Sequence, residues 1–137
     1  MIDNAALNTL LDSFFRNQAP PGNWYLGIID AASFTALAIG DTMASHAGWI
    51  ELTAYDGATR PLWASVAASG QLIVAPTVLL TANAVKTWRG LFLASDSTKG
   101  GTSGILWATG LFDSTAALNP GEDITLSYEL TAQGRDA

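Results

Sequence analysis

Apolar residues near the start of the chain recur with the period of an α-helix. They occupy positions i, i+3, i+4, i+7 and i+8, as Leu7, Leu10, Leu11, Phe14 and Phe15. Either Asp3 or Asn4, which precede the pattern, can cap the helix, and Asn17 is suited to a left-handed cap at its end. The proline pair and glycine at 20–22 prevent continuation. The pattern predicts one amphipathic helix within residues 1–17.

From Trp24 onward the pattern changes to short apolar runs, rich in aromatic and branched residues, that Gly, Pro, Asp or Asn interrupt every dozen residues or so. The predicted strands cover residues 24–29, 49–55, 71–74, 78–81, 86–95, 105–112 and 124–131. Asp41 is expected to cap a short helical turn over 42–46. Pro76 indicates a sheet edge or a bend. The polar, glycine-rich segment 96–104 is expected to be the mobile tip of a hairpin.

In the last of these runs apolar and polar residues alternate, which predicts a strand with one face inward and the other in water. The turn signal before it is Asn119-Pro120-Gly121. The predicted fold is mainly β: an antiparallel β-sandwich or jelly-roll-like barrel with one N-terminal α-helix. We expect a single domain over 1–137, with the helix in 1–17 and the β-sandwich in 24–132.

Charged residues make up only 13% of the chain, about half of what an ordinary soluble domain carries. The surface must therefore expose neutral polar and apolar groups, which predicts contact with other proteins; the alternative is a compact monomer coated in small polar residues. The net charge of −6 argues against direct nucleic-acid binding. The chain has no cysteine, which fits folding in a reducing cytoplasm, and no apolar run suited to a membrane span.

Residues suited to catalysis are scarce. His46 is the only histidine, without the spacing of a metal site or the sequence context of a Ser-His-Asp triad. The glycines of segment 96–104 depart from phosphate-loop spacing. Five tryptophans favour core packing over a protein interface or a stacking platform for sugar. We therefore expect no enzymatic activity, no cofactor and no metal.

Several segments resemble small virion proteins of tailed bacteriophages. The similar segments are 10–16 with 24–30, the stretch from Gly48 to Trp63, 89–93 and 106–108. The resemblance implies a non-enzymatic capsid decoration or cement protein that binds the major capsid protein lattice as a homo-oligomer such as a trimer. Its location would be the virion, assembled in the host cytoplasm. The alternatives are a tail, fibre or head–tail adaptor component, or a carbohydrate-binding module.

Two groups of residues are candidates for partner binding. The first comprises Asp56, Arg60, Trp63 and Lys99, because loops carry recognition on sandwich folds and Arg and Trp are enriched at interface hot spots. Arg60 has an equally favoured alternative role in a buried pair with Glu51.

The second group is the helix stripe, represented by Leu7, Leu11 and Phe14. The stripe serves either of two purposes: it closes the open end of its own sandwich, which we favour, or it reaches a neighbouring protomer. No direct contact with nucleic acid or membrane is expected.

Overall fold

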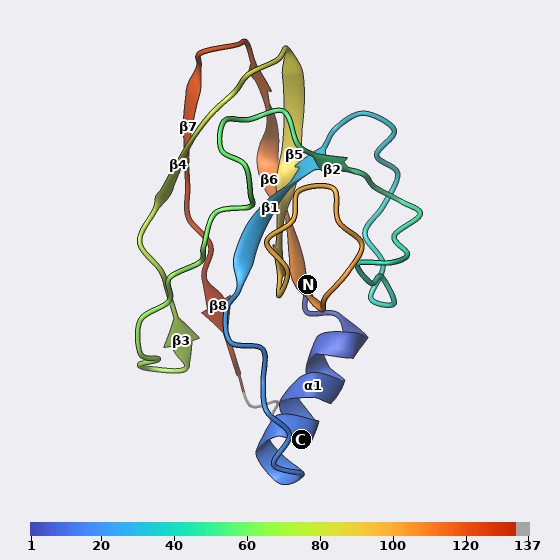
Figure 1. Ribbon diagram of the computed structural model, residues 1–137, viewed down its shortest axis with the longest axis vertical. Helices are drawn as coiled ribbons and strands as arrows, with labels where there is room; N and C mark the ends of the chain where they lie inside the picture. Colours follow the sequence, from blue (N-terminus) through green and yellow to red (C-terminus); the bar gives the residue numbers. More distant parts are fainter. Residues whose placement is uncertain (134–137) are drawn as a thin grey trace.

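The computed structural model describes residues 1–133 and shows a mainly antiparallel β protein with one N-terminal helix, α1 (Asn4–Phe15) (Figure 1). The strands are β1 (Tyr25–Asp30), β2 (Glu51–Leu52), β3 (Leu72–Ile73), β4 (Val78–Thr81), β5 (Lys86–Ala94), β6 (Leu106–Leu118), β7 (Asp123–Leu126) and β8 (Leu130–Thr131). The arrangement is that of a β-sandwich, and the described strands do not close into a barrel.

The larger sheet has the strand order β2-β1-β5-β6. One of its two central strands, β1, is buried from Leu26 to Asp30, because loops cover one face and the second layer covers the other. Gly27 lies opposite Phe92 in the register, and a Cβ at this position would overlap the Phe92 ring. A glycine in the middle of this strand is therefore a packing requirement.

The second layer consists of two short antiparallel pairs, β4 with β7 and β3 with β8. The predicted alternation in the last segment is confirmed: its apolar side chains are buried or half-buried, and the polar ones between them are exposed. The turn before it is confirmed too, with Gly121 at a φ of +88° and the Glu122 N–H donating to the Asn119 carbonyl at 3.1 Å. Pro76 lies in the irregular link between β3 and β4, as expected of a bend.

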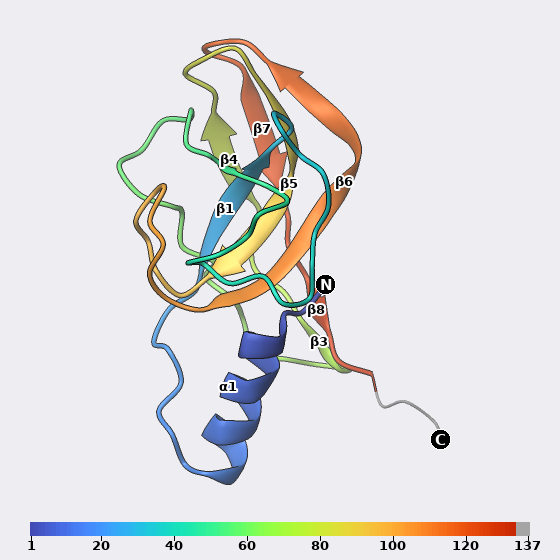
Figure 2. The same cartoon turned by 90° about the vertical axis from the view of Figure 1, so that its right-hand side faces the viewer.

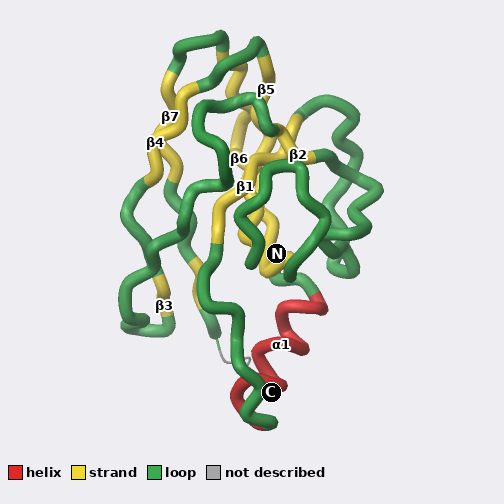
Figure 3. Tube along the Cα trace, viewed as in Figure 1, coloured by secondary structure: helices red, strands yellow, loops and turns green. Residues whose placement is uncertain are grey.

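The core between the layers contains Ile28, Tyr55, Trp88, Leu91 and Leu126. A second cluster lies beneath the loop that joins β1 to β2, a long segment without helix or strand (Figure 3). The core interpretation of the tryptophans is confirmed for Trp49, Trp63 and Trp88, which are buried. Trp24 and Trp107 are half-buried and pack edge to face.

Some predicted elements are wrong in extent or kind. The strand expected over 49–55 shrinks to β2, and the final one divides into β7 and β8. The helical turn expected over 42–46 is absent from this described segment. Its proposed cap, Asp41, instead accepts hydrogen bonds from the Ala38 N–H at 3.0 Å and the Trp49 indole Nε1–H at 2.9 Å. Asp41 thus provides the acceptor for the buried indole of Trp49.

Helix α1 projects beyond the ends of the sheets (Figure 2). Residues 1–3 anchor it by running antiparallel to β6: the Asp3 N–H donates to the Trp107 carbonyl, and the Thr109 N–H donates to the Met1 carbonyl. Asn17 has a φ of +54°, as expected for a left-handed cap. Within residues 1–133 no helix has the length and apolar character needed to cross a bilayer.

Candidate docking surface

The apolar stripe of α1 lies in solvent. Phe14 is 80% exposed and Phe15 is 75% exposed, and both lie in the last turn with their rings in edge contact at 5.0 Å. Leu7, Leu10 and Leu11 are also exposed. Within α1, all of which is described, Ala6 is the one buried residue. The stripe therefore does not close its own sandwich, and that favoured interpretation is wrong.

An apolar groove of about 300 Å³ lies at the base of the helix. We call it the basal groove. Its largest apolar side chains come from residues 1–3, α1, β3, β6 and β8, namely Ile2, Leu7, Leu10, Leu72, Ile73, Trp107 and Leu130. The described residues that line it include no charged side chain. A smaller hollow of about 200 Å³ adjoins it, sharing Ile73, Trp107 and Leu130 and adding Trp24 and Trp63.

Charge is nearly absent from this surface. The charged residues of α1 are Asp12 and, at its C-terminal cap, Arg16, whose side chains form an exposed ion pair at 3.1 Å. The pair neutralises itself, so the helix contributes no net charge although the chain carries −6. The stripe and the basal groove together form a continuous, uncharged apolar surface.

The anchor of the helix contains a buried carboxyl group. Asp3 is fully buried, and neither of its carboxyl oxygens has a hydrogen-bond partner within residues 1–133. Burial, assisted by the charge of Asp41 and opposed by the Met1 amine, raises the pKa of Asp3 to about 7. Asp3 occupies the N-cap position, as predicted, but its side chain makes no capping hydrogen bond.

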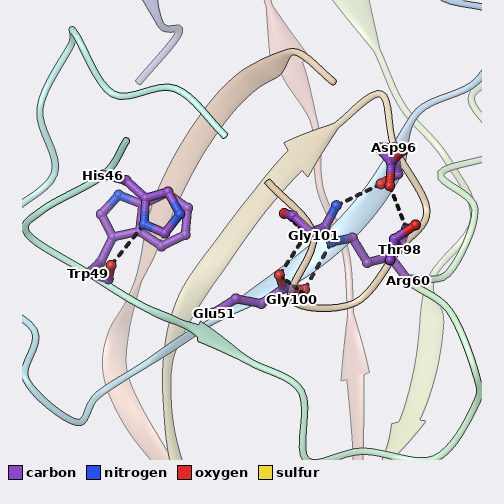
Figure 4. A network of polar contacts seen from close by, with 8 residues as sticks. All are labelled: His46, Trp49, Glu51, Arg60, Asp96, Thr98, Gly100 and Gly101. Atoms are coloured by element: carbon purple, nitrogen blue, oxygen red, sulfur yellow. Dashed lines mark hydrogen bonds and ion pairs between the residues drawn. The ribbon is translucent and has the colours of Figure 1, made fainter. Parts of the chain in front are cut away.

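Arg60 is only 1% exposed and joins two segments of the chain (Figure 4). Its Nε donates to Glu51 Oε1 at 2.9 Å and its Nη2 to Glu51 Oε2 at 2.6 Å, which is a bidentate ion pair. Its Nη1 donates to the Asp96 carbonyl at 2.8 Å, and Nη2 also donates to the Gly101 carbonyl at 3.1 Å. The buried pair with Glu51 is confirmed. Arg60 is not a surface anchor, because its donors are used inside the protein.

Of the other loop candidates, Trp63 and Lys99 have partners within the domain, whereas Asp56 is exposed. Trp63 is buried, and its indole Nε1–H donates to the Tyr128 carbonyl at 3.0 Å. Lys99 Nζ donates to the Tyr55 carbonyl at 2.6 Å and lies 3.6 Å from the centre of the Tyr55 ring. Burial lowers the pKa of Lys99, and Glu51 and Asp56 oppose that effect. Asp56 is exposed, as a contact residue must be.

The loop 96–104 is fastened to the body of the domain. Besides the Arg60 and Lys99 contacts, the Gly100 N–H donates to Glu51 Oε2 at 2.9 Å. Within the loop, the Thr98 N–H donates to Asp96 Oδ1 at 2.7 Å, and this hydrogen bond is the main reason that the pKa of Asp96 is lowered. The predicted hairpin is confirmed by the pairing of β5 with β6. Its tip, which was expected to be mobile, is held against the domain by these hydrogen bonds, because the buried arginine uses the loop carbonyls as acceptors.

Three further polar side chains, those of His46, Lys86 and Asp30, have structural partners. His46 stacks on Trp49 with ring centroids 3.9 Å apart, and its Nδ1 lies 2.9 Å from the Trp49 carbonyl oxygen (Figure 4). An open hollow of about 540 Å³ contains the ion pair of Lys86 with Asp30, at 3.1 Å. Within the described part of the chain, no cluster of three His, Cys, Asp or Glu is arranged to hold a metal ion.

The structure brings Leu7, Leu11 and Phe14 together on one surface and separates them from Arg60 and Trp63, which are buried. Sequence reasoning missed the basal groove entirely. No family model and no curated protein matches this chain. The exposed apolar surface is therefore the strongest evidence for what the protein does.

Proposed function

We propose that this protein is a non-enzymatic structural protein of a phage virion, a decoration or cement protein that binds the major capsid protein lattice and stabilises the head. The observation that carries the proposal is the unpartnered apolar stripe of α1. A contiguous, exposed apolar surface on a small domain usually marks contact with another protein.

The physics of short helices strengthens this interpretation. α1 has 12 residues, a length at which an isolated helix is marginal in water, and helices of this size owe most of their stability to packing of an apolar face. In α1 the apolar face lies against other described residues at the base of the helix, and the rest of the face is exposed to solvent. We infer that binding a partner protein supplies the missing packing.

The identity of the partner rests on two further supports. The first is the resemblance of segments within residues 10–108 to small phage virion proteins, which is our reason for proposing a capsid location, with the tail as the alternative. The low charged fraction suits a protein that is packed against neighbours in an assembled particle. A protein that binds the assembled lattice and not the free subunits stabilises the lattice by mass action, so many modest contacts suffice.

The test is to mix the purified protein with undecorated capsids of the source phage, pellet them and count bound copies. Saturable binding near one copy per capsid subunit, or one trimer per three-fold junction, is the expected result. Phe14→Asp is expected to lower binding. Val85→Asp is the matched control, because Val85 is 74% exposed, lies outside the stripe and takes the same added charge.

Absence of binding to capsids would contradict the decoration role. A tail, fibre or adaptor protein would then bind tail components instead. Quenching of tryptophan fluorescence by oligosaccharides would favour the carbohydrate-binding alternative, since Trp24 and Trp107 line the hollow beside the basal groove.

A further inference from the structure

We propose that the apolar stripe of α1 in one copy of this protein occupies the basal groove of a second copy, and that the contact is reciprocal. The inference rests on the proposed assembly role and names the partner of the helix. The two surfaces are complementary in chemistry, since an uncharged apolar ridge faces an uncharged apolar hollow.

The arrangement of the stripe and the basal groove favours binding of the stripe to the groove of a second molecule over binding to the groove of its own chain. Leu7 and Leu10 already line the basal groove, and the stripe continues from them to Phe14 one to two turns further along. α1 is a single helix that projects away from the sheets (Figure 2). Because the groove lies at the base of the helix, the tip of α1 lies away from its own groove. A second helix lying antiparallel to the first brings each tip to the other molecule's groove, which is the self-complementary geometry of a two-fold interface.

The area available is sufficient for such an interface. Phe14 and Phe15, at 80% and 75% exposed, together offer roughly 300 Å² of apolar surface, since a phenylalanine buries about 150–250 Å². With the exposed leucines, one helix offers roughly 500 Å². A reciprocal contact then covers on the order of 1,000 Å² before the groove walls are counted, which is about the smallest area expected of a specific interface.

Electrostatics permits two acidic copies to meet at this surface. Two chains of charge −6 repel each other in general. The stripe and the basal groove carry no net charge, because Asp12 is paired with Arg16 and the groove lining is uncharged. Two copies can therefore associate through this surface without bringing like charges into contact.

The first experiment measures the oligomeric state of the full chain by sedimentation at several micromolar concentrations. We expect reversible self-association that Phe14→Asp weakens about thirtyfold or more, the loss typical of an interface hot spot. Val85→Asp should associate as the wild type does. A wild-type monomer throughout this range, or association unaffected by Phe14→Asp, would overturn the inference. Circular dichroism of both variants serves to check that they fold.

A cross-linking experiment tests the geometry and uses the absence of native cysteine. One preparation carries Phe14→Cys and another carries Leu72→Cys, and the two are mixed and oxidised, so that a mixed disulfide must join two copies. We expect efficient formation of this mixed dimer. The Val85→Cys and Leu72→Cys mixture is the control. Equal yields in the two mixtures would overturn the proposed pairing.

Capsid binding is scored separately on the same variants, so the two proposals fail independently. Self-association through the stripe without capsid binding supports this inference and contradicts the decoration role. A wild-type monomer whose capsid binding is lost in Phe14→Asp supports the decoration role and overturns this inference, because the stripe then contacts the capsid.

Discussion

The carboxyl group of Asp3 makes a pH-dependent contribution to stability that one substitution should remove. The side chain is fully buried where residues 1–3 pair with β6, and neither oxygen accepts a hydrogen bond from residues 1–133. The charges that act on it are the Asp41 carboxylate and the Met1 amine. Ionisation of Asp3 in the folded protein is therefore unfavourable.

The magnitude follows from the pKa. A pKa raised from 3.8 to about 7 corresponds to roughly 4 kcal/mol of preference for the protonated form in the folded state. Below a pH of about 4 both states are protonated, and the contribution to stability is complete. Between about 4 and 7 the unfolded chain releases the proton while the folded protein retains it, so the contribution is lost as the pH rises and stays lost above about 7.

The substitution Asp3→Asn replaces the acid with a neutral group of nearly the same size. At about pH 4 the free energies of unfolding of wild type and variant should agree within about 1 kcal/mol. At about pH 8 the variant should be more stable by roughly 2 to 4 kcal/mol, because it avoids a buried unpaired charge. Urea titrations at both pH values, followed by circular dichroism, measure the two differences.

Asp12→Asn is the matched control, since Asp12 forms an exposed ion pair on the same helix, worth at most about 1 kcal/mol. All other ionisable groups are common to the proteins compared, so their effects cancel in the differences. A stability gap between Asp3→Asn and wild type that is the same at both pH values would refute the reasoning, because it would mean that Asp3 does not titrate between them.

Other substitutions test the interior of the domain. Arg60→Ala should lower the free energy of unfolding by about 3 to 5 kcal/mol, measured by urea titration, because it leaves the Glu51 carboxylate buried without its partner; a loss below about 1 kcal/mol would contradict that role. Gly27→Ala should cost about 1 to 3 kcal/mol, seen as a lower thermal midpoint, because the added Cβ meets the Phe92 ring. Combining it with Phe92→Leu should cost less than the sum of the two separate changes, and strict additivity would show that the two sites do not touch.

Elements defined by a local period could be predicted from the sequence. The helix stripe, the alternating last segment, the pairing of β5 with β6 and the turn before β7 each depend on residues close together in the chain. The short strands could not be delimited, because the extent of β2 depends on where its partner β1 lies. The role of Asp41 could not be predicted from its neighbours in sequence, because its decisive contact is with Trp49, a tertiary neighbour.

The candidate site was predictable only in part. Periodicity identified Leu7, Leu11 and Phe14 as one face of a helix, but it does not say whether that face is covered. The basal groove is formed by residues 1–3, α1, β3, β6 and β8. No local sequence pattern predicts that these segments come into contact. For Arg60 the sequence allowed both an exposed and a buried role, and only the position of Glu51 in the fold decides between them.

The anchoring of the helix has a consequence for the order of events during synthesis. The Met1 amine donates to the Thr109 carbonyl, a contact that spans 108 residues. Translation at about 5–20 residues per second leaves the first residues waiting roughly 5 to 20 s before β6 has even been made. Throughout that interval the apolar stripe is tethered to an unfinished chain. The pairing of copies that we propose can therefore take its correct geometry only after β6 has been made.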